Sequence, residues 1–201
     1  IELHMVTRQL FTYSDLHQKS GRKCMKLTTP RVPVLDEQEW SDEQREILEK
    51  QSTRGHIPNV FRTVIRHEKL AKRWLVFGAH IMAKSSLSPR EREMAILRSG
   101  WLADSEYEWH QHAVIGQEEG LSPEEIEGIK TGADAGCWTD HEQFILRAAD
   151  ELHESSFISD EIWDGLSRTY STNQMLDLIF TCGQYRMLAG ALNSLGVQIE
   201  D

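Results

Sequence analysis

Cysteine is scarce in this sequence, and long hydrophobic runs are missing. The chain of 201 residues has three cysteines, at Cys24, Cys137 and Cys182, and no Cys-x-x-Cys pair. This odd, scattered set excludes a disulfide framework and a cysteine-type zinc finger, and it suits a reducing cytoplasm. No apolar run reaches the roughly 20 residues that span a bilayer, and no secretory signal is recognisable. We therefore expect a cytoplasmic protein.

Positive charge is also in deficit. The sequence has 22 lysines and arginines against 32 aspartates and glutamates, which gives a formal net charge of −10. A surface this negative repels the phosphates of nucleic acids and the head groups of anionic lipids. We therefore expect neither nucleic acid nor a membrane as the main partner.

Length and composition favour one globular domain after a short arm. With 39% hydrophobic and 27% charged residues, the chain can form a sizeable core. Residues 1–4 look like a cloning remnant, and residues 6–30 are basic and show no sustained period. We assign residues 1–30 to a tag remnant and mobile arm, with an organelle-targeting peptide as the alternative, and residues 31–201 to the folded domain.

Helix-start signals recur from Ser41 onward. A hydroxyl residue followed three positions later by Glu or Gln is typical of a capping box, in which each side chain accepts from an unpaired backbone N–H. The pattern occurs at Ser41–Gln44, Ser88–Glu91, Ser122–Glu125, Thr139–Glu142 and Ser171–Gln174. No segment alternates like a β-strand between hairpin turns. The sequence therefore predicts an all-α fold, with helices at about 41–51, 59–66, 68–84, 88–102, 105–119, 122–130, 139–154, 159–169 and 171–195.

Three ionisable residues on two of these helices could carry chemistry. Glu108 and His112 are four positions apart, which places them on one face of the helix at 105–119. Glu93 comes from the preceding, largely apolar helix, where an ionised carboxylate is costly without a partner. A carboxylate that faces a glutamate–histidine pair in this way is typical of a proton relay.

Aromatic and polar neighbours could complete a binding site around this group. Three aromatic residues close to the pair could exclude water, and one of them, Tyr107, adds a hydroxyl donor. Amides in the apolar C-terminal helix also need partners. The candidate substrate-binding residues are Trp101, Ser105, Trp109, Gln184 and Tyr185.

Each of these patterns also has an ordinary structural explanation. A glutamate–histidine pair at this spacing is common as a surface ion pair, tryptophans at helical spacing are common in cores, and the amides could cross-link helices. His110 projects away from the pair, and no His-Glu-x-x-His or Glu-x-x-His motif occurs, so we expect no bound metal. No glycine-rich phosphate loop or nucleophile elbow is recognisable.

The stretches around these residues resemble the carboxymuconolactone decarboxylase family, which shares its fold with the alkylhydroperoxidase D proteins. The resemblance covers about residues 31–196. It rests on three segments: Glu-Arg-Glu-Met-Ala-Ile-Leu-Arg at 91–98, Ser-Glu-Tyr-Glu-Trp-His-Gln-His at 105–112 and the closing Gly-Gln-Tyr…Leu-Asn-Ser-Leu-Gly-Val. It implies an alkylhydroperoxidase D-like helical bundle that needs no cofactor and assembles as a homo-oligomer, a trimer or a hexamer.

The peroxidase branch of this superfamily carries a Glu, followed on the next helix by Cys-x-x-Cys-x-x-x-His. Glu93 and His112 match the ends of that pattern. Ser105 and Glu108, however, stand where the two cysteines would be. Because peroxide reduction in that branch needs a thiolate and a resolving thiol, the resemblance implies the thiol-free decarboxylase branch instead.

These observations lead to the hypothesis of a cofactor-independent lyase (a decarboxylase) or isomerase that acts on a small carboxylated lactone or keto acid. In this hypothesis His112 is the general acid/base and Glu108 orients and tunes it. Glu93 determines how many protons the three ionisable residues hold together, and the Tyr107 hydroxyl donates to the developing oxyanion of the substrate. An alkylhydroperoxidase-like oxidoreductase and a non-catalytic binding or assembly protein remain alternatives.

Overall fold

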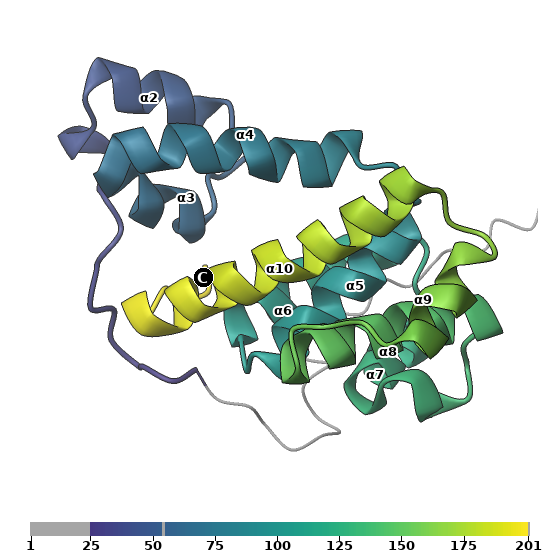
Figure 1. Ribbon diagram of the computed structural model, residues 1–201. Helices are drawn as coiled ribbons and strands as arrows, with labels where there is room; N and C mark the ends of the chain where they lie inside the picture. The colour runs from purple at the N-terminus through teal and green to yellow at the C-terminus, as the bar shows by residue number, and fades with distance from the viewer. Residues whose placement is uncertain (1–24, 54, 201) are drawn as a thin grey trace, which may run out of the picture.

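The computed structural model describes residues 25–53 and 55–200 (Figure 1). These residues form helices joined by short loops, and the β-structure among them is one isolated bridge between Thr53 and His56. The all-α fold expected from the sequence is confirmed. Within the described residues, no helix is both long and apolar enough to cross a membrane.

The helices begin and end close to the predicted positions. The α-helices are α2 (Asp42–Glu49), α3 (Asn59–Val64), α4 (Glu68–Lys84), α5 (Pro89–Leu102), α6 (Glu106–Glu118), α7 (Pro123–Thr131), α8 (Asp140–Glu154), α9 (Asp160–Ser167) and α10 (Thr172–Leu195). Short 3₁₀ turns lie at η1 (Glu37–Glu39), η2 (Ile65–His67) and η3 (Ala133–Ala135).

All five predicted capping boxes form. In each, the hydroxyl accepts from the third residue of the helix, while the side chain of that residue accepts from the cap backbone. At the start of α5, for example, the Ser88 hydroxyl accepts from Glu91 N, and Glu91 Oε2 accepts from Ser88 N at 3.0 Å. Each cap contributes roughly 1 kcal/mol, which explains why the local sequence fixes these helix starts so well.

The expected N-terminal arm is described only in part. Residues 25–30 lie against the end of α10, where Gln198 Nε2 donates to the Leu27 carbonyl at 3.0 Å. Residues 1–24 lie outside the described residues, so the assignment of the arm and of its boundary at residue 30 stays a prediction.

Helix α5 is the centre of the molecule. It packs against α6, α8 and α10, and Figure 1 shows it behind α10 with α6 and α8 nearby. The stretch 92–100 is buried without a gap, and the apolar run at its centre, residues 94–97, lies entirely in the interior. The charged residues within it, Arg92, Glu93 and Arg98, therefore have to find partners inside the fold.

Helices α2, α3 and α4 form a separate layer on one side of this centre (Figure 1). They share a small hydrophobic cluster of their own, which includes Leu48, Ile65 and Ala71. Along its length α4 makes only limited contact with α10. This arrangement leaves room between the layer and the central helices.

Two glycines allow α5 and α6 to approach closely. A side chain at Gly100 would place its first carbon 3.2 Å from Glu108 Cβ. At the other end of the pair, a first carbon at Gly116 would meet the side chains of Leu121 and Leu97 at 3.1 and 3.3 Å. The close approach brings the polar residues of α6 within reach of Glu93 on α5.

The outer face of α10 is partly apolar. Leu176, Phe180 and Met187 are each about half exposed, at 49%, 56% and 57%. They follow the spacing of one helical face. The homo-oligomer implied by the resemblance stays a prediction.

Candidate active site

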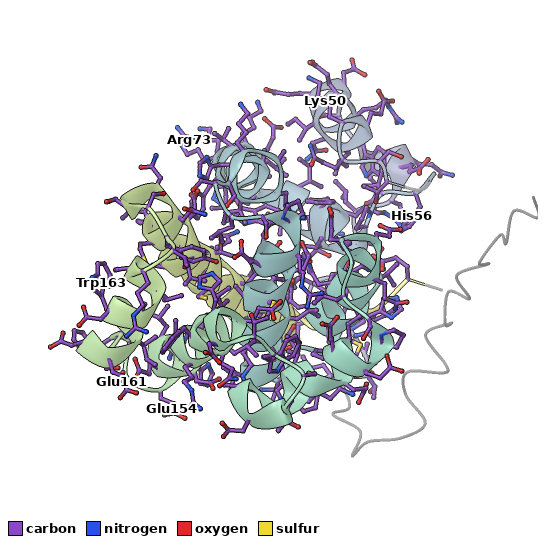
Figure 2. All side chains as sticks on the ribbon, turned by 90° about the vertical axis from the view of Figure 1, so that its right-hand side faces the viewer. Lys50, His56, Arg73, Glu154, Glu161 and Trp163 are labelled. Carbon is purple, nitrogen blue, oxygen red and sulfur yellow. The ribbon has the colours of Figure 1, made fainter. Side chains whose placement is uncertain are left out.

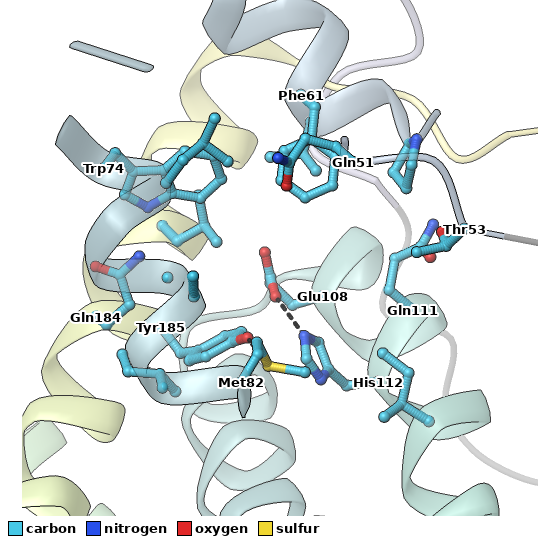
Figure 3. Close-up of a pocket in the computed structure, with 18 of the residues that line it drawn as sticks. Gln51, Thr53, Phe61, Trp74, Met82, Glu108, Gln111, His112, Gln184 and Tyr185 are labelled. Carbon is cyan, nitrogen blue, oxygen red and sulfur yellow. Dashed lines mark hydrogen bonds and ion pairs between the residues drawn. The ribbon is translucent and has the colours of Figure 1, made fainter. Parts of the chain in front are cut away.

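A pocket of about 630 Å³ lies between the α2–α4 layer and the helices α6 and α10. Its walls are mostly apolar, with Val60, Phe61, Leu75 and Leu188 among them. Glu108 and His112 of α6 also line it, and Figure 3 shows both side chains at the pocket with an interaction between them. The size suits a small organic molecule.

Three buried side chains form a connected series of polar contacts at this pocket. Glu93 Oε2 lies 2.7 Å from His112 Nδ1, and His112 Nε2 lies 3.6 Å from Glu108 Oε2. Glu93 is 0% exposed, Glu108 4% and His112 6%, so all three lie away from bulk water. The convergence that the sequence suggested is therefore present. Glu93 itself does not line the pocket but stands behind His112.

Arg92 extends this series of polar contacts, and its part in the site was not predicted from the sequence. Its Nε donates to Glu93 Oε1 at 2.9 Å, and its other nitrogens donate to the Met82 carbonyl of α4 (3.1 Å) and to Glu119 (3.3 Å). A buried carboxylate needs such a counter-charge. The signal was available, because Arg92 directly precedes Glu93 in the sequence and carries the opposite charge.

The structure places Trp101, Ser105 and Trp109 outside the pocket lining. The two indoles pack edge to face, 5.3 Å apart, and belong to the hydrophobic cluster of α5, α6 and α7. The Lys130 ammonium lies over both rings. Ser105 is the N-cap of α6 and accepts from Glu108 N. The two tryptophans pack on the side of α6 that faces α7, and Ser105 caps the start of α6. All three side chains therefore stabilise the fold at their observed positions.

Tyr107 lines the pocket, but its hydroxyl is already engaged. It donates to Glu200 Oε1 at 2.7 Å and accepts from Val60 N at 3.1 Å. Burial, followed by the charge of Glu200, raises the pKa of Tyr107 far above its ordinary value. The role expected for it, as a donor to a substrate oxygen, would require this pair to break. That role stays a prediction.

Gln184 and Tyr185 both line the pocket from α10. The Tyr185 ring meets the His112 ring edge to face, with 4.8 Å between centroids, and its hydroxyl contacts Met82 Sδ at 3.2 Å. Burial, with the charges of Glu108 and Glu93, raises the pKa of Tyr185 well above 10. Tyr185 therefore stays neutral and holds the imidazole in place.

The wall contributed by α4 was not identified from the sequence. Trp74, Leu75 and Met82 line the pocket from this helix. The periodicity of α4 shows an apolar face but does not say which helix or cavity that face meets.

Neither a metal centre nor a reactive thiol is apparent at the pocket within the described part of the chain. The described residues hold no group of three or more His, Cys, Asp and Glu side chains arranged for a metal ion. Cys182 is buried outside the lining, and burial raises its pKa to about 11. Cys137 is exposed in a loop and does not line the pocket either.

Comparisons with known proteins bear on the fold. The carboxymuconolactone decarboxylase family profile matches residues 68–151, which include α4, α5, α6, α7 and most of α8. Over these residues the chain is similar to that family, and its fold is that of AhpD-like proteins. No curated protein sequence matches it.

Several solved structures share the fold of this chain at low sequence identity. An alkylhydroperoxidase AhpD core, an uncharacterized peroxidase-related protein from Ralstonia eutropha JMP134, is 19% identical, with a TM-score of 0.77 over 86% of this chain and 93% of that one. A peroxidase-related protein from Silicibacter sp. TM1040 is 18% identical, with a TM-score of 0.75 over 87% and 95%. The debrominase Bmp8 in complex with 2,3,4-tribromopyrrole is 16% identical, with a TM-score of 0.73 over 86% and 93%.

In this pocket, the environment moves the pKa of Glu108 into the neutral range. Burial is the largest influence and raises the pKa, the charge of His112 lowers it, and the charge of Glu93 raises it again, to about 7. For His112, burial disfavours the imidazolium, but attraction and hydrogen bonding to Glu93 outweigh it, so the pKa rises above 6.5. At neutral pH the pair therefore holds protons that it can give or take.

These pKa values predict how the stability of this protein depends on pH. Both folded-state pKa values are raised, so the folded protein binds more protons than the unfolded chain. The stabilisation from Glu108 is complete below pH 4.5 and is lost as the pH rises through about 7. The stabilisation from His112 is complete below pH 6.5 and is lost as the pH rises through the raised pKa of this residue.

We expect the free energy of unfolding to fall between about pH 5 and 8, and Glu108→Gln to flatten this decline. Urea unfolding at a series of pH values measures both slopes. Equal slopes for the wild type and the variant would mean that Glu108 titrates in the folded protein as it does in the unfolded chain.

Proposed function

We propose that this protein is a cofactor-independent lyase or isomerase that moves protons on a small carboxylated lactone or keto acid. One observation carries the proposal. A buried series of side-chain contacts leads from Arg92 through Glu93 and His112 to Glu108, which lines a mostly apolar pocket. Perturbed acid–base groups inside a pocket are typical of catalytic sites.

The two ring nitrogens of His112 have different roles in this proposal. Glu93 accepts from Nδ1–H and thereby leaves Nε2 to face Glu108 and the pocket. A proton on Nε2, or on the Glu108 carboxyl with its pKa of about 7, can then be delivered to a substrate in the pocket. Glu93 and Arg92 act as positioning residues, because they contact His112 and each other but do not line the pocket.

Decarboxylation by such a pair needs no external oxidant. The bond between the carboxyl carbon and its neighbour breaks, CO₂ leaves, and the electron pair moves into a carbonyl already present in the substrate. The resulting enolate takes a proton on carbon from His112 or Glu108. The apolar walls favour loss of the charged carboxylate, and the same groups serve an isomerisation when a proton is removed and returned at a different carbon.

The relatives support a small substrate without identifying it. The molecule bound to the debrominase Bmp8, 2,3,4-tribromopyrrole, is a compact ring. A thiol peroxidase of the kind suggested by the fold has less support, because Cys137 and Cys182 do not line the pocket. Peroxide consumption that disappears on alkylation of the cysteines would favour that alternative.

The proposal is tested by following small carboxylated lactones and keto acids with the protein in D₂O. Proton NMR detects both the loss of substrate and the entry of deuterium at the carbon that is protonated. We expect turnover of at least one compound and its loss in His112→Ala. Turnover that survives in both His112→Ala and Glu108→Gln would show that these residues do not carry the reaction.

A further inference from the structure

Two buried polar atoms of the pocket wall have no hydrogen-bond partner among the residues that the structure describes. They are the indole Nε1 of Trp74 on α4 and the amide Oε1 of Gln184 on α10. Gln184 is only 4% exposed. Figure 3 shows both side chains on one side of the pocket, with His112 and Gln111 on the other. An unpaired buried donor or acceptor destabilises the free protein, so a ligand group that pairs with it is favoured.

Charge is nearly absent on this side of the pocket. Of the lysines and arginines in the described part of the chain, only Lys50 lines the pocket. Its ammonium is paired with Glu46 at 2.8 Å, its side chain is 67% exposed, and Figure 2 shows it at the outer edge of the molecule. An anionic group near Trp74 would therefore have no buried counter-charge, and its desolvation would be uncompensated.

We infer that Trp74 and Gln184 form a second subsite, which recognises an uncharged group of the substrate that both accepts and donates a hydrogen bond. A hydroxyl fits this description, because its oxygen accepts from Trp74 Nε1–H and its proton goes to Gln184 Oε1. The apolar walls between this subsite and Glu108 hold the body of the molecule. Small side-chain rotations that are common on binding expose the two atoms to it.

This inference rests on the proposed function for its orientation, with the reacting end of the substrate at His112 and Glu108. It adds that the far end is neutral and hydroxylated. The two can fail separately, since the inference concerns binding and the proposed function concerns turnover.

Four probes of similar size separate the contributions. Phenol accepts and donates, anisole only accepts, toluene does neither, and benzoate is an anion. Their dissociation constants are measured at pH 8 by following the indole N–H signals in ¹⁵N NMR spectra, with the Trp74 signal assigned from its loss in Trp74→Phe. Calorimetry gives the affinities for that variant.

We expect phenol to shift the Trp74 signal and to bind roughly three- to tenfold more tightly than anisole, with toluene weaker still. Benzoate is expected to leave the Trp74 signal unshifted, because its carboxylate has no counter-charge beside Trp74. Gln184→Met is expected to weaken phenol binding by a similar factor and to leave anisole unchanged, because anisole has no proton for the amide. Trp74→Phe is expected to weaken both. Trp163→Phe is the matched control, since Trp163 lies on α9 at the periphery of the molecule (Figure 2) and is 43% exposed.

Three results would overturn the inference. The first is the absence of any shift at Trp74 with all four probes. The second is equal binding of phenol and toluene, or a shift of the Trp74 signal by benzoate as large as that by phenol. The third is a loss of thermal stability in Trp74→Phe and Gln184→Met with unchanged affinities, which would mean that the two groups satisfy each other within the wall.

Discussion

Glu108→Gln is expected to lower kcat/KM for the substrate by about 10²- to 10⁴-fold, the usual contribution of a general acid–base group. The amide has nearly the shape of the carboxyl but cannot release or bind a proton in the neutral range. His112→Ala is expected to cost at least as much, because it also removes the group that faces Glu93 at 2.7 Å. Steady-state kinetics on a substrate found in the D₂O experiment measures both.

Two further variants separate catalysis from general damage. Glu124→Gln makes the same change of charge on α7, away from the pocket lining, and is expected to leave turnover unchanged. Glu93→Gln removes the charge that raises the pKa of His112, so the pH profile of kcat/KM should shift to lower pH along with any loss of rate. A purely structural role for Glu93 would reduce the amount of active protein without moving the profile.

Arg92→Met is expected to destabilise the fold by about 3–5 kcal/mol, the typical cost of leaving one partner of a buried ion pair unpaired. Arg92 and Glu93 are both buried, and the guanidinium also binds the Met82 carbonyl at the end of α4. The variant therefore leaves a buried carboxylate with less counter-charge and an unpaired carbonyl. Urea unfolding monitored by circular dichroism gives the change in free energy.

The double variant Arg92→Met/Glu93→Gln tests this explanation. It removes both charges, and we expect it to recover most of the stability lost in Arg92→Met. The matched control is Arg90→Met on the same helix. Arg90 pairs with Glu125 and Glu142, but its side chain is 29% exposed, so we expect a loss of about 1 kcal/mol. If the double variant is no more stable than Arg92→Met, the buried charge is not the cause.

The helices could be predicted because their signals are local. Each capping box needs only residues three positions apart, and all five formed at the predicted residues. The predicted helix at 59–66 shows the limit of this approach. The chain there divides into α3 and the 3₁₀ turn η2 before α4 begins at Glu68. Such a change in winding depends on how Ile65 packs into the cluster with Leu48, which no local pattern records.

The meeting of Glu93 with His112 could be foreseen, whereas the walls around it could not. The i and i+4 spacing places Glu108 and His112 on one helix face, and a carboxylate in the apolar part of the preceding helix needs a buried partner. Which aromatic residues face that site depends on how three helices pack. Trp109 therefore packs in the core beside Trp101, and Trp74 on α4 takes the place at the pocket.

Glu108 and His112 are expected to share protons near neutral pH inside the fold. A titration followed by NMR measures this, with ¹³C-labelled glutamate carboxyls and ¹⁵N-labelled imidazoles assigned from Glu108→Gln and His112→Ala. We expect Glu108 to titrate near pH 7 and His112 to remain an imidazolium above pH 6.5, and we expect the titration of His112 to change in Glu108→Gln. A Glu108 carboxyl that titrates near pH 4.5, beside a His112 that titrates near 6.5 and is indifferent to Glu108→Gln, would contradict it.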